Sequence, residues 1–94
     1  MINILIVDDE DRIRRIISDF LKREGFNILE ARNGKEAIDI YNEKYEMISL
    51  IILDVMMPKI DGWSVLKHVR TISKTTPIMM LTAKTEDSDQ LYGF

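Results

Sequence analysis

The chain has 94 residues, 46% of them hydrophobic, a size that suits one domain with one core and leaves no room for two. It has no cysteine, which excludes disulfides and thiolate metal sites, and its single histidine, His68, excludes a multi-histidine metal site. The formal net charge is −3 and no basic block interrupts the mixed charges, so we expect no direct binding of nucleic acid. Because no apolar run reaches the roughly 20 residues that span a bilayer, and residues 1–10 lack a signal-peptide pattern, we expect no membrane association and a cytoplasmic location.

In the first part of the chain, a short apolar run is followed by a helical pattern and then by a second apolar run. Residues 2–7 are apolar and β-branched, which predicts a strand. Residues 12–24 then carry apolar side chains at helical spacing, namely Ile13, Ile16, Ile17, Phe20 and Leu21. Gly25 is placed to end this helix in the left-handed conformation, and residues 26–31 predict the second strand.

The pair Asn33-Gly34 has two interpretations. Asn33 precedes Glu36 by three positions, which is the spacing of a helix N-cap with a capping box. An Asn-Gly pair is also typical of a hairpin turn. The downstream side chains favour the helix because their spacing is helical: Ala37, Ile38, Tyr41 and Tyr45.

The remaining elements continue the alternation. Residues 49–54 predict a third strand, and residues 62–72 predict a helix with one apolar face made of Val65, Leu66, Val69 and Ile72. The Asp61-Gly62 pair is most simply an N-cap and a turn. Pro77 opens a fourth strand over residues 77–82, and a fourth helix is expected from Thr85 or Asp87 onward. Continuous apolar strands that alternate with amphipathic helices predict an α/β domain with a doubly wound parallel sheet.

Polar side chains stand where three of the predicted strands end. Asp8 and Asp9 follow the first strand, Asp54 ends the third and Thr82 ends the fourth. Because ligands of an open α/β sheet bind at the carboxyl ends of its strands, we expect these side chains to meet at one edge. Carboxylates held together repel one another unless a cation joins them, and oxygen ligands without histidine or cysteine favour a hard cation such as Mg²⁺. An ionised carboxylate can attack phosphorus without a general base, so this edge could support phosphoryl transfer.

Each acid also has a simpler interpretation when it is taken alone. Asp8 and Asp9 could stabilise the start of a helix through its dipole, and Asp54 could cap a turn. Thr82 alone indicates almost nothing. The occurrence of all four at one predicted sheet edge favours the functional interpretation for Asp9, Asp54 and Thr82.

The segments that carry these residues resemble the receiver domain of bacterial two-component response regulators. They are VDDE (7–10), LDVMMPKIDG (53–62) and LTA (81–83), with ARNGKEA (31–37) in addition. The Asp-x-x-Met-Pro-x-x-Asp-Gly pattern with an upstream Asp-Asp pair is highly specific, and the resemblance runs along the whole chain. It is slightly closer to the winged-helix transcription-factor subfamily. It implies a receiver (phosphoacceptor) domain over residues 1–94, with the flavodoxin-like fold and strand order 2-1-3-4.

The resemblance also implies a role for each site residue. Asp54 would accept a phosphoryl group from a sensor histidine kinase. Asp9 and Asp54 would bind Mg²⁺ directly, Asp8 would bind it through water, and Met56 would contribute its backbone carbonyl. Thr82 would be the switch hydroxyl that contacts the phosphate. The domain would then be a signalling module rather than an enzyme, and phosphorylation would change partner binding in a protein that regulates transcription.

The chain departs from the family pattern toward its C-terminus. Receiver domains have a fifth strand with an invariant lysine and then a fifth helix, and no residue here matches that lysine, since Lys84 lies at a position where the family varies. We therefore expect a domain that is incomplete at its C-terminus, lacks the fifth strand and fifth helix, and binds Mg²⁺ but takes up phosphate poorly. We also expect self-association, either through the exposed edge of the fourth strand or by segment exchange. DNA would be bound only through a missing effector domain.

Two other functions are compatible with the acids. A Mg²⁺-dependent phosphohydrolase with an aspartyl-phosphate intermediate would use the same nucleophile. Such enzymes typically carry a second acid two residues after it, where this chain has Met56. A pure interaction domain whose acids bind no metal is the other alternative.

Overall fold

A four-stranded parallel sheet forms the centre of the molecule. The computed structural model describes residues 2–55 and 61–81. The strands are β1 (Asn3–Val7), β2 (Asn27–Ala31), β3 (Leu50–Asp54) and β4 (Ile78–Leu81), and the helices are α1 (Asp11–Arg23), α2 (Gly34–Lys44) and α3 (Gly62–Ile72). The predicted fourth helix, from residue 85 onward, lies outside the described residues.

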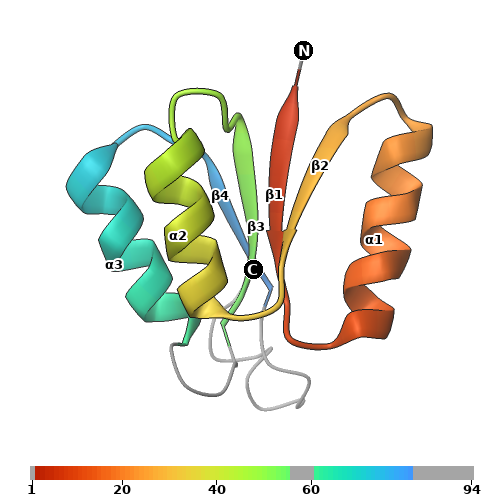
Figure 1. The fold of residues 1–94 in the computed structure, drawn as a ribbon, viewed down its shortest axis with the longest axis horizontal. Coiled ribbons are helices and arrows are strands. Elements are labelled where there is room, and N and C mark those ends of the chain that lie inside the picture. Colours follow the sequence, from red (N-terminus) through yellow and green to blue (C-terminus); the bar gives the residue numbers. More distant parts are fainter. Residues whose placement is uncertain (1, 56–60, 82–94) are drawn as a thin grey trace.

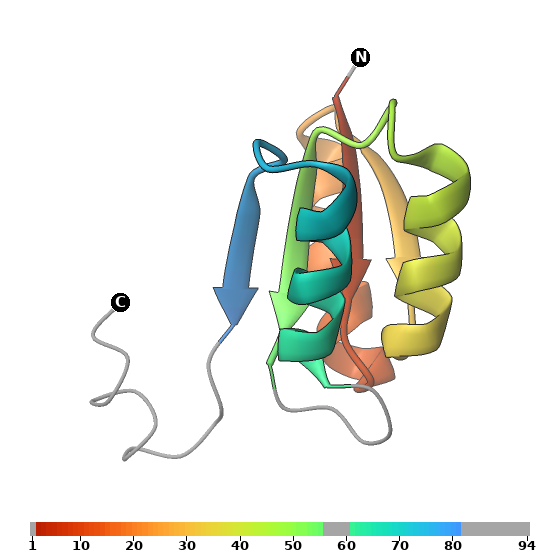
Figure 2. The same cartoon turned by 90° about the vertical axis from the view of Figure 1, so that its left-hand side faces the viewer.

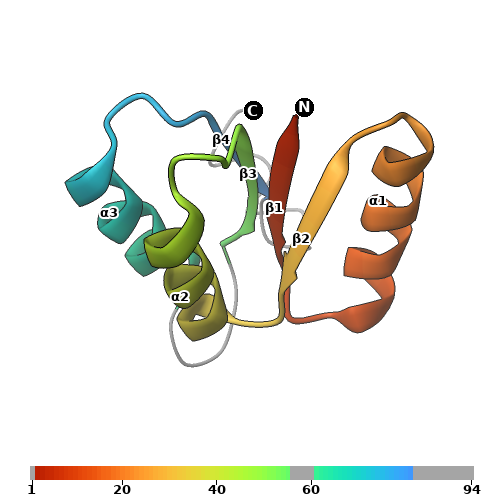
Figure 3. The ribbon, with the colours of Figure 1, turned by 45° about the horizontal axis from the view of Figure 1, so that its top comes forward.

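The strands lie in the order β2-β1-β3-β4 and every neighbouring pair is parallel. Helix α1 covers one face of this sheet, while α2 and α3 cover the other (Figures 1 and 3). Because every crossover returns over a face of the sheet, the carboxyl ends of all four strands lie at one edge (Figure 1). The predicted α/β class, parallel sheet and strand order 2-1-3-4 are confirmed.

The core is divided by the sheet into two clusters. Alternate residues of β1 point to opposite faces, so Leu5 and Val7 pack toward α2 and α3, whereas Ile4 and Ile6 pack toward α1. On the α2 and α3 side, the fully buried Tyr41 hydroxyl shares a hydrogen bond of 3.0 Å with Thr76 Oγ1. The side chains of β1 are buried throughout, which explains the unbroken apolar run in the sequence.

Helix α1 ends as the sequence predicts. Gly25 has φ of +94°, and its N–H donates to the carbonyl of Lys22 at 3.0 Å. The N–H of Phe26 donates to the carbonyl of Leu21 at 3.2 Å. These two bonds form a Schellman motif, in which a left-handed residue satisfies the last helical carbonyls.

Helix α2 begins at the Asn-Gly pair, so the helical interpretation is confirmed and the hairpin is wrong. The Asn33 side chain accepts a hydrogen bond of 2.8 Å from the N–H of Glu36. The Glu36 carboxylate accepts from the N–H of Arg32 at 2.9 Å and from its guanidinium, one residue earlier than in the standard capping box. The hydrogen bonds from the Arg32 side chain and backbone hold the pKa of Glu36 below its ordinary value.

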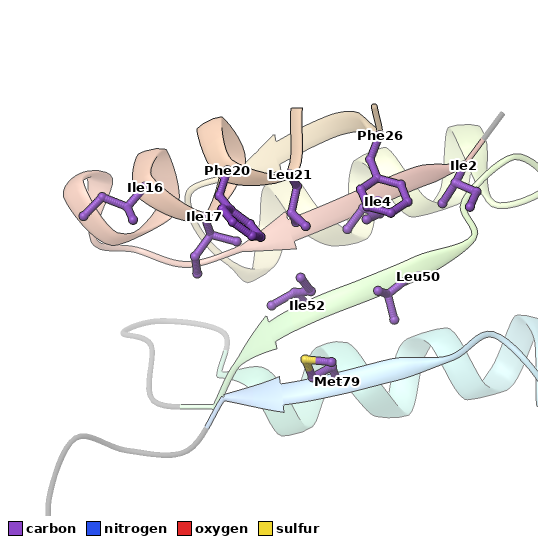
Figure 4. A pocket seen from close by; sticks show the side chains of 10 residues that line it. All are labelled: Ile2, Ile4, Ile16, Ile17, Phe20, Leu21, Phe26, Leu50, Ile52 and Met79. Carbon is purple, nitrogen blue, oxygen red and sulfur yellow. The ribbon is translucent and has the colours of Figure 1, made fainter. Parts of the chain in front are cut away.

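The apolar stripe of α1 lines a groove on the face that α1 only partly covers. Helix α1 packs over β2 and β1. Its side chains Ile16 and Phe20 are 60% and 56% exposed, and they face this groove of about 680 Å³ across from Met79 of β4 (Figure 4). The buried side chains of α1 are instead polar, Arg14 and Ser18, which the hydrophobic pattern did not indicate.

Helix α3 follows its predicted pattern with one exception. Val65 and Val69 are buried and Leu66 packs against the same cluster. Ile72, predicted on the same face, is exposed because it is the last residue of the helix, after which the chain turns toward β4. Among residues 2–55 and 61–81, no helix has both the length and the apolar character that a membrane span requires.

We predict that Gly25→Ala lowers the free energy of unfolding by about 1 kcal/mol, because an L side chain strains a left-handed residue. No atom lies within 4 Å of the added Cβ, so crowding does not contribute. Gly25→Asn is the matched control and should lower the free energy of unfolding by less, since asparagine tolerates this conformation. Urea unfolding measures both variants, and equal stability of Gly25→Ala and the parent would contradict the prediction.

Candidate functional site

The register between β1 and β3 brings two aspartates to the same place. Val7 pairs with Leu53, so the residues that follow, Asp8 and Asp54, leave the sheet side by side at its carboxyl edge. Asp9 follows Asp8 directly. Carboxylate oxygens of Asp8, Asp9 and Asp54 all lie within 4.8 Å of one another. The structure therefore brings together the three acids that the sequence predicts at this edge.

The three carboxylates differ in their exposure. Asp8 and Asp54 are each 2% exposed, whereas Asp9 faces solvent. Negative charges this close repel one another, and water screens that repulsion poorly for the two buried groups. A bound cation would relieve the repulsion. The donor set, carboxylates without histidine or cysteine, suits Mg²⁺, which takes one or two carboxylates and keeps several waters.

Asp8 is held at three of its atoms. Its N–H donates to the carbonyl of Ala31 at 3.1 Å, which ties the end of β1 to β2. Its Oδ1 accepts from the N–H of Glu10 at 2.9 Å, and its carbonyl oxygen accepts from Arg14 Nη1 at 2.8 Å. The turn between β1 and α1 is therefore fixed before any ligand binds.

Asp54 is positioned by β3 and by the close approach of α3. It pairs with Leu81 of β4, and the next residue, Val55, donates its N–H to the Leu81 carbonyl at 3.2 Å. The N–H of Gly62 donates to the Val55 carbonyl at 3.1 Å. A Cβ on Gly62 would collide with the carbonyl oxygen of Asp54 and would lie 2.7 Å from the Val55 Cα. Glycine is therefore required here for the approach of two backbones.

Asp61 is the N-cap of α3, as the sequence predicts. Its Oδ1 accepts a hydrogen bond of 2.9 Å from the N–H of Ser64. The Asp61-Gly62 pair thus combines a cap with a contact residue, and the second role was not predicted. Met56 and Thr82, for which the sequence also predicts site roles, lie outside the described residues.

Sequence reasoning missed the residues that support the acids. Arg14 is buried on α1 and bonds to Glu30 of β2, which in turn bonds to Ser18. Two signals were available: a charge inside the apolar strand 26–31, and a polar pair four residues apart beside the apolar stripe of α1. Both signals are ambiguous until the helix is docked on the sheet.

Comparison with known proteins identifies the family. The model of the family "Response regulator receiver domain" matches residues 4–93. This chain belongs to that family. A receiver domain is a signalling module rather than an enzyme, so the phosphohydrolase alternative is not supported.

Individual relatives agree with this assignment. The transcriptional regulatory protein SrrA of Staphylococcus aureus is 50% identical over 91 residues, which cover 97% of this chain but only 36% of SrrA. A complex of CheX, CheY, BeF₃ and Mg²⁺ from Borrelia burgdorferi contains a chain that is 35% identical with a TM-score of 0.80; the match covers 84% of this chain and 60% of that one. The response regulator TrrA, solved in complex with the histidine kinase ThkA, gives 36% identity and a TM-score of 0.80, with 96% and 79% covered. The receiver domain described here thus spans about a third of the length of SrrA.

We predict that Gly62→Ala lowers the free energy of unfolding by about 1 to 3 kcal/mol, the cost of forcing extra volume into a packed site. The new methyl group must push α3 away from the Asp54 backbone. Ser64→Ala, two positions later on the exposed side of α3, is the matched control and should change stability by less than about 0.5 kcal/mol. Urea unfolding distinguishes the two, and a Gly62→Ala variant as stable as Ser64→Ala would contradict the close approach.

Proposed function

We propose that this receiver domain accepts a phosphoryl group from a sensor histidine kinase on Asp54, and that the phosphorylated domain changes its binding to partners. The observation that supports this most directly is the group of three carboxylates within 4.8 Å at the carboxyl edge of the sheet. Asp54 is the acceptor in this proposal because it ends the central strand β3 and matches the acceptor aspartate of the family pattern. The domain would act in the cytoplasm.

The chemistry requires little of the protein beyond positioning. Bound Mg²⁺ would neutralise charge on the transferred phosphoryl group. An Asp54 carboxylate oxygen would form the new bond to phosphorus as the phosphorus–nitrogen bond of the donor phosphohistidine breaks. The electron pair of that bond returns to the histidine. Asp8 and Asp9 attract the cation, and the buried position of Asp54 fixes the direction of attack.

The ligand set in this proposal is Asp9 and Asp54 directly, Asp8 through water and the Met56 backbone carbonyl. Thr82 would contact the transferred phosphoryl group. The CheY complex that contains Mg²⁺ and the ThkA–TrrA complex support a metal and a histidine kinase partner for a receiver of this fold. The similarity to SrrA supports a role in regulating transcription through regions of a longer protein.

We predict that the 94-residue chain binds Mg²⁺ and that Asp9→Asn and Asp54→Asn each weaken its affinity about tenfold or more. Each substitution removes one charged ligand from the cluster. Isothermal titration calorimetry measures the affinity, and Asp39→Asn, which removes an exposed acid from α2, is the control with the same change of charge. Absence of Mg²⁺ binding by the parent would favour the interaction domain that binds no metal.

We predict slow, incomplete phosphorylation of this chain by acetyl phosphate with Mg²⁺, because no residue in it matches the lysine of the family. Intact mass should show a minor species with one phosphoryl group, which disappears without Mg²⁺ and in Asp54→Asn. Rapid stoichiometric phosphorylation would contradict the expected need for the lysine. A species that persists in Asp54→Asn would contradict the choice of acceptor.

We also propose that this chain self-associates through β4 or by segment exchange. Within the described residues, β4 lies at the edge of the sheet and pairs only with β3 (Figure 2). Residues 78–81 contain neither proline nor lysine, the residues that discourage pairing of an edge strand. Its side chain Met79 is exposed in the apolar groove of α1, which would add apolar contact area.

Met79→Lys should shift the protein toward the monomer, because it places a charge on this edge. Met47→Lys is the matched control, since Met47 is similarly exposed in the connection between α2 and β3. Light scattering across a concentration series measures the average mass. A parent protein that is monomeric at high concentration would contradict the proposal.

A further inference from the structure

Arg14 of α1 connects three parts of the molecule next to the acidic site. It is 8% exposed, although arginine is rarely buried without partners. Its Nη1 donates to the carbonyl oxygen of Asp8 at 2.8 Å, its Nη2 to Asp11 Oδ1 at 2.7 Å and its Nε to Glu30 Oε1 at 2.9 Å. Every nitrogen of the guanidinium therefore has a partner, and the partners lie on the β1–α1 turn, on α1 and on β2.

The far side of this network is also fixed. Glu30 Oε2 accepts a hydrogen bond of 3.3 Å from Ser18 Oγ, one turn after Arg14 on α1, and Ser18 is itself buried. Burial lowers the pKa of Arg14, but the hydrogen bonds to Asp11 and Glu30 outweigh this effect and raise the pKa above its ordinary value. The guanidinium thus keeps its charge, and its bonds are of the strong charge-assisted kind.

The hydrogen bond from Arg14 to the Asp8 carbonyl restrains the peptide that leads into Asp9. The peptide unit between Asp8 and Asp9 is planar, so a hydrogen bond that fixes the Asp8 carbonyl also fixes the N and Cα of Asp9. The Asp8 side chain is held separately by the N–H of Glu10 at 2.9 Å. Asp54, in contrast, is held by the backbone of β3 and its pairing with β4. Asp9, the exposed acid of the cluster, depends on the turn for its position.

We propose that Arg14 is the positioning residue of the metal site: by holding the Asp8 carbonyl, it orients the Asp9 carboxylate toward Asp8 and Asp54. This inference depends on the proposed binding of Mg²⁺. Arg14 contacts neither the metal nor the transferred group and acts only through the Asp8–Asp9 peptide, with Glu30 and Ser18 holding its other side.

The sign of the effect separates positioning from simple electrostatics. Replacement of Arg14 with a neutral residue makes the protein more negative, and by charge alone this should strengthen the binding of a cation. Loss of positioning should weaken it, because outer partners of a metal site typically contribute ten- to hundredfold in affinity. The two explanations predict opposite changes for one substitution.

The experiment compares Arg14→Gln with Arg32→Gln by titration calorimetry with Mg²⁺. Arg32→Gln is the matched control because it removes the same charge. The Arg32 side chain is exposed and bonds to Glu36, not to the β1–α1 turn. We expect Arg14→Gln to weaken Mg²⁺ affinity about tenfold, and Arg32→Gln to leave it unchanged or slightly stronger. Arg14→Lys keeps the positive charge but cannot make the three hydrogen bonds of the guanidinium, so its Mg²⁺ affinity should be as weak as that of Arg14→Gln. An Arg14→Gln variant that is folded and binds Mg²⁺ as tightly as the parent would overturn the proposal.

A measurement without metal separates this proposal from the proposed function. Hydrogen exchange of the Glu10 amide, which donates to Asp8, reports on the turn in the metal-free protein. It should be faster in Arg14→Gln than in Arg32→Gln at matched stability, measured by urea unfolding. Equal exchange rates would overturn the positioning role even if Mg²⁺ binds. If the parent binds no Mg²⁺, the proposed function fails, while faster exchange would still show that Arg14 holds the β1–α1 turn. If Arg14→Gln does not fold, Ser18→Ala tests the same network. Its Glu10 amide should exchange faster than that of Arg32→Gln, by a smaller factor than expected for Arg14→Gln. An exchange rate equal to that of Arg32→Gln would overturn the proposal.

Discussion

The parallel pairing of β1 with β3 is the constraint on which the acidic site depends. Val7 and Leu53 are register partners, so Asp8 and Asp54 emerge beside each other although 46 positions separate them in the chain. Side chains in a strand alternate between faces, and a slip of one residue would turn the buried apolar set of β3 toward the wrong face. The hydrophobic packing that fixes the register therefore also fixes the distance between two like charges. The energy that holds the acids together comes from the core.

The two sides of the site are held in different ways. On the β3 side, Asp54 belongs to the sheet, and Gly62 allows α3 to begin against its backbone. On the β1 side, Asp8 lies beyond the end of the strand. Its carbonyl oxygen is held there by a hydrogen bond from the buried Arg14. A buried charge is tolerated there because each of its nitrogens is paired. In the proposed role of Arg14, this support would set the position of the exposed Asp9 carboxylate before a metal binds.

Much of this architecture could be predicted from the sequence, because it depends on local patterns of apolar and capping residues. Apolar runs and helical spacing predicted the strands and helices in their order, and Gly25, Asn33 and Asp61 marked ends and beginnings of helices that the structure confirms. The placement of the acids at strand ends followed from the rule that parallel strands end at one edge. The partners of Arg14 did not follow. Glu30 lies 16 positions away, and nothing in the local sequence states how α1 crosses β2.

The sequence by itself determined which residues can form strands, where helices start and stop, and that three carboxylates come to one edge of a sheet. These properties depend on the local backbone and on side-chain alternation, which a single segment encodes. Only the tertiary structure decided that the polar Arg14 and Ser18 are buried while Ile16 and Phe20 are exposed, and that Gly62 is needed for a close approach rather than for a turn. Those outcomes depend on how helices dock on the sheet, and docking is set by the sum of many weak contacts between distant segments.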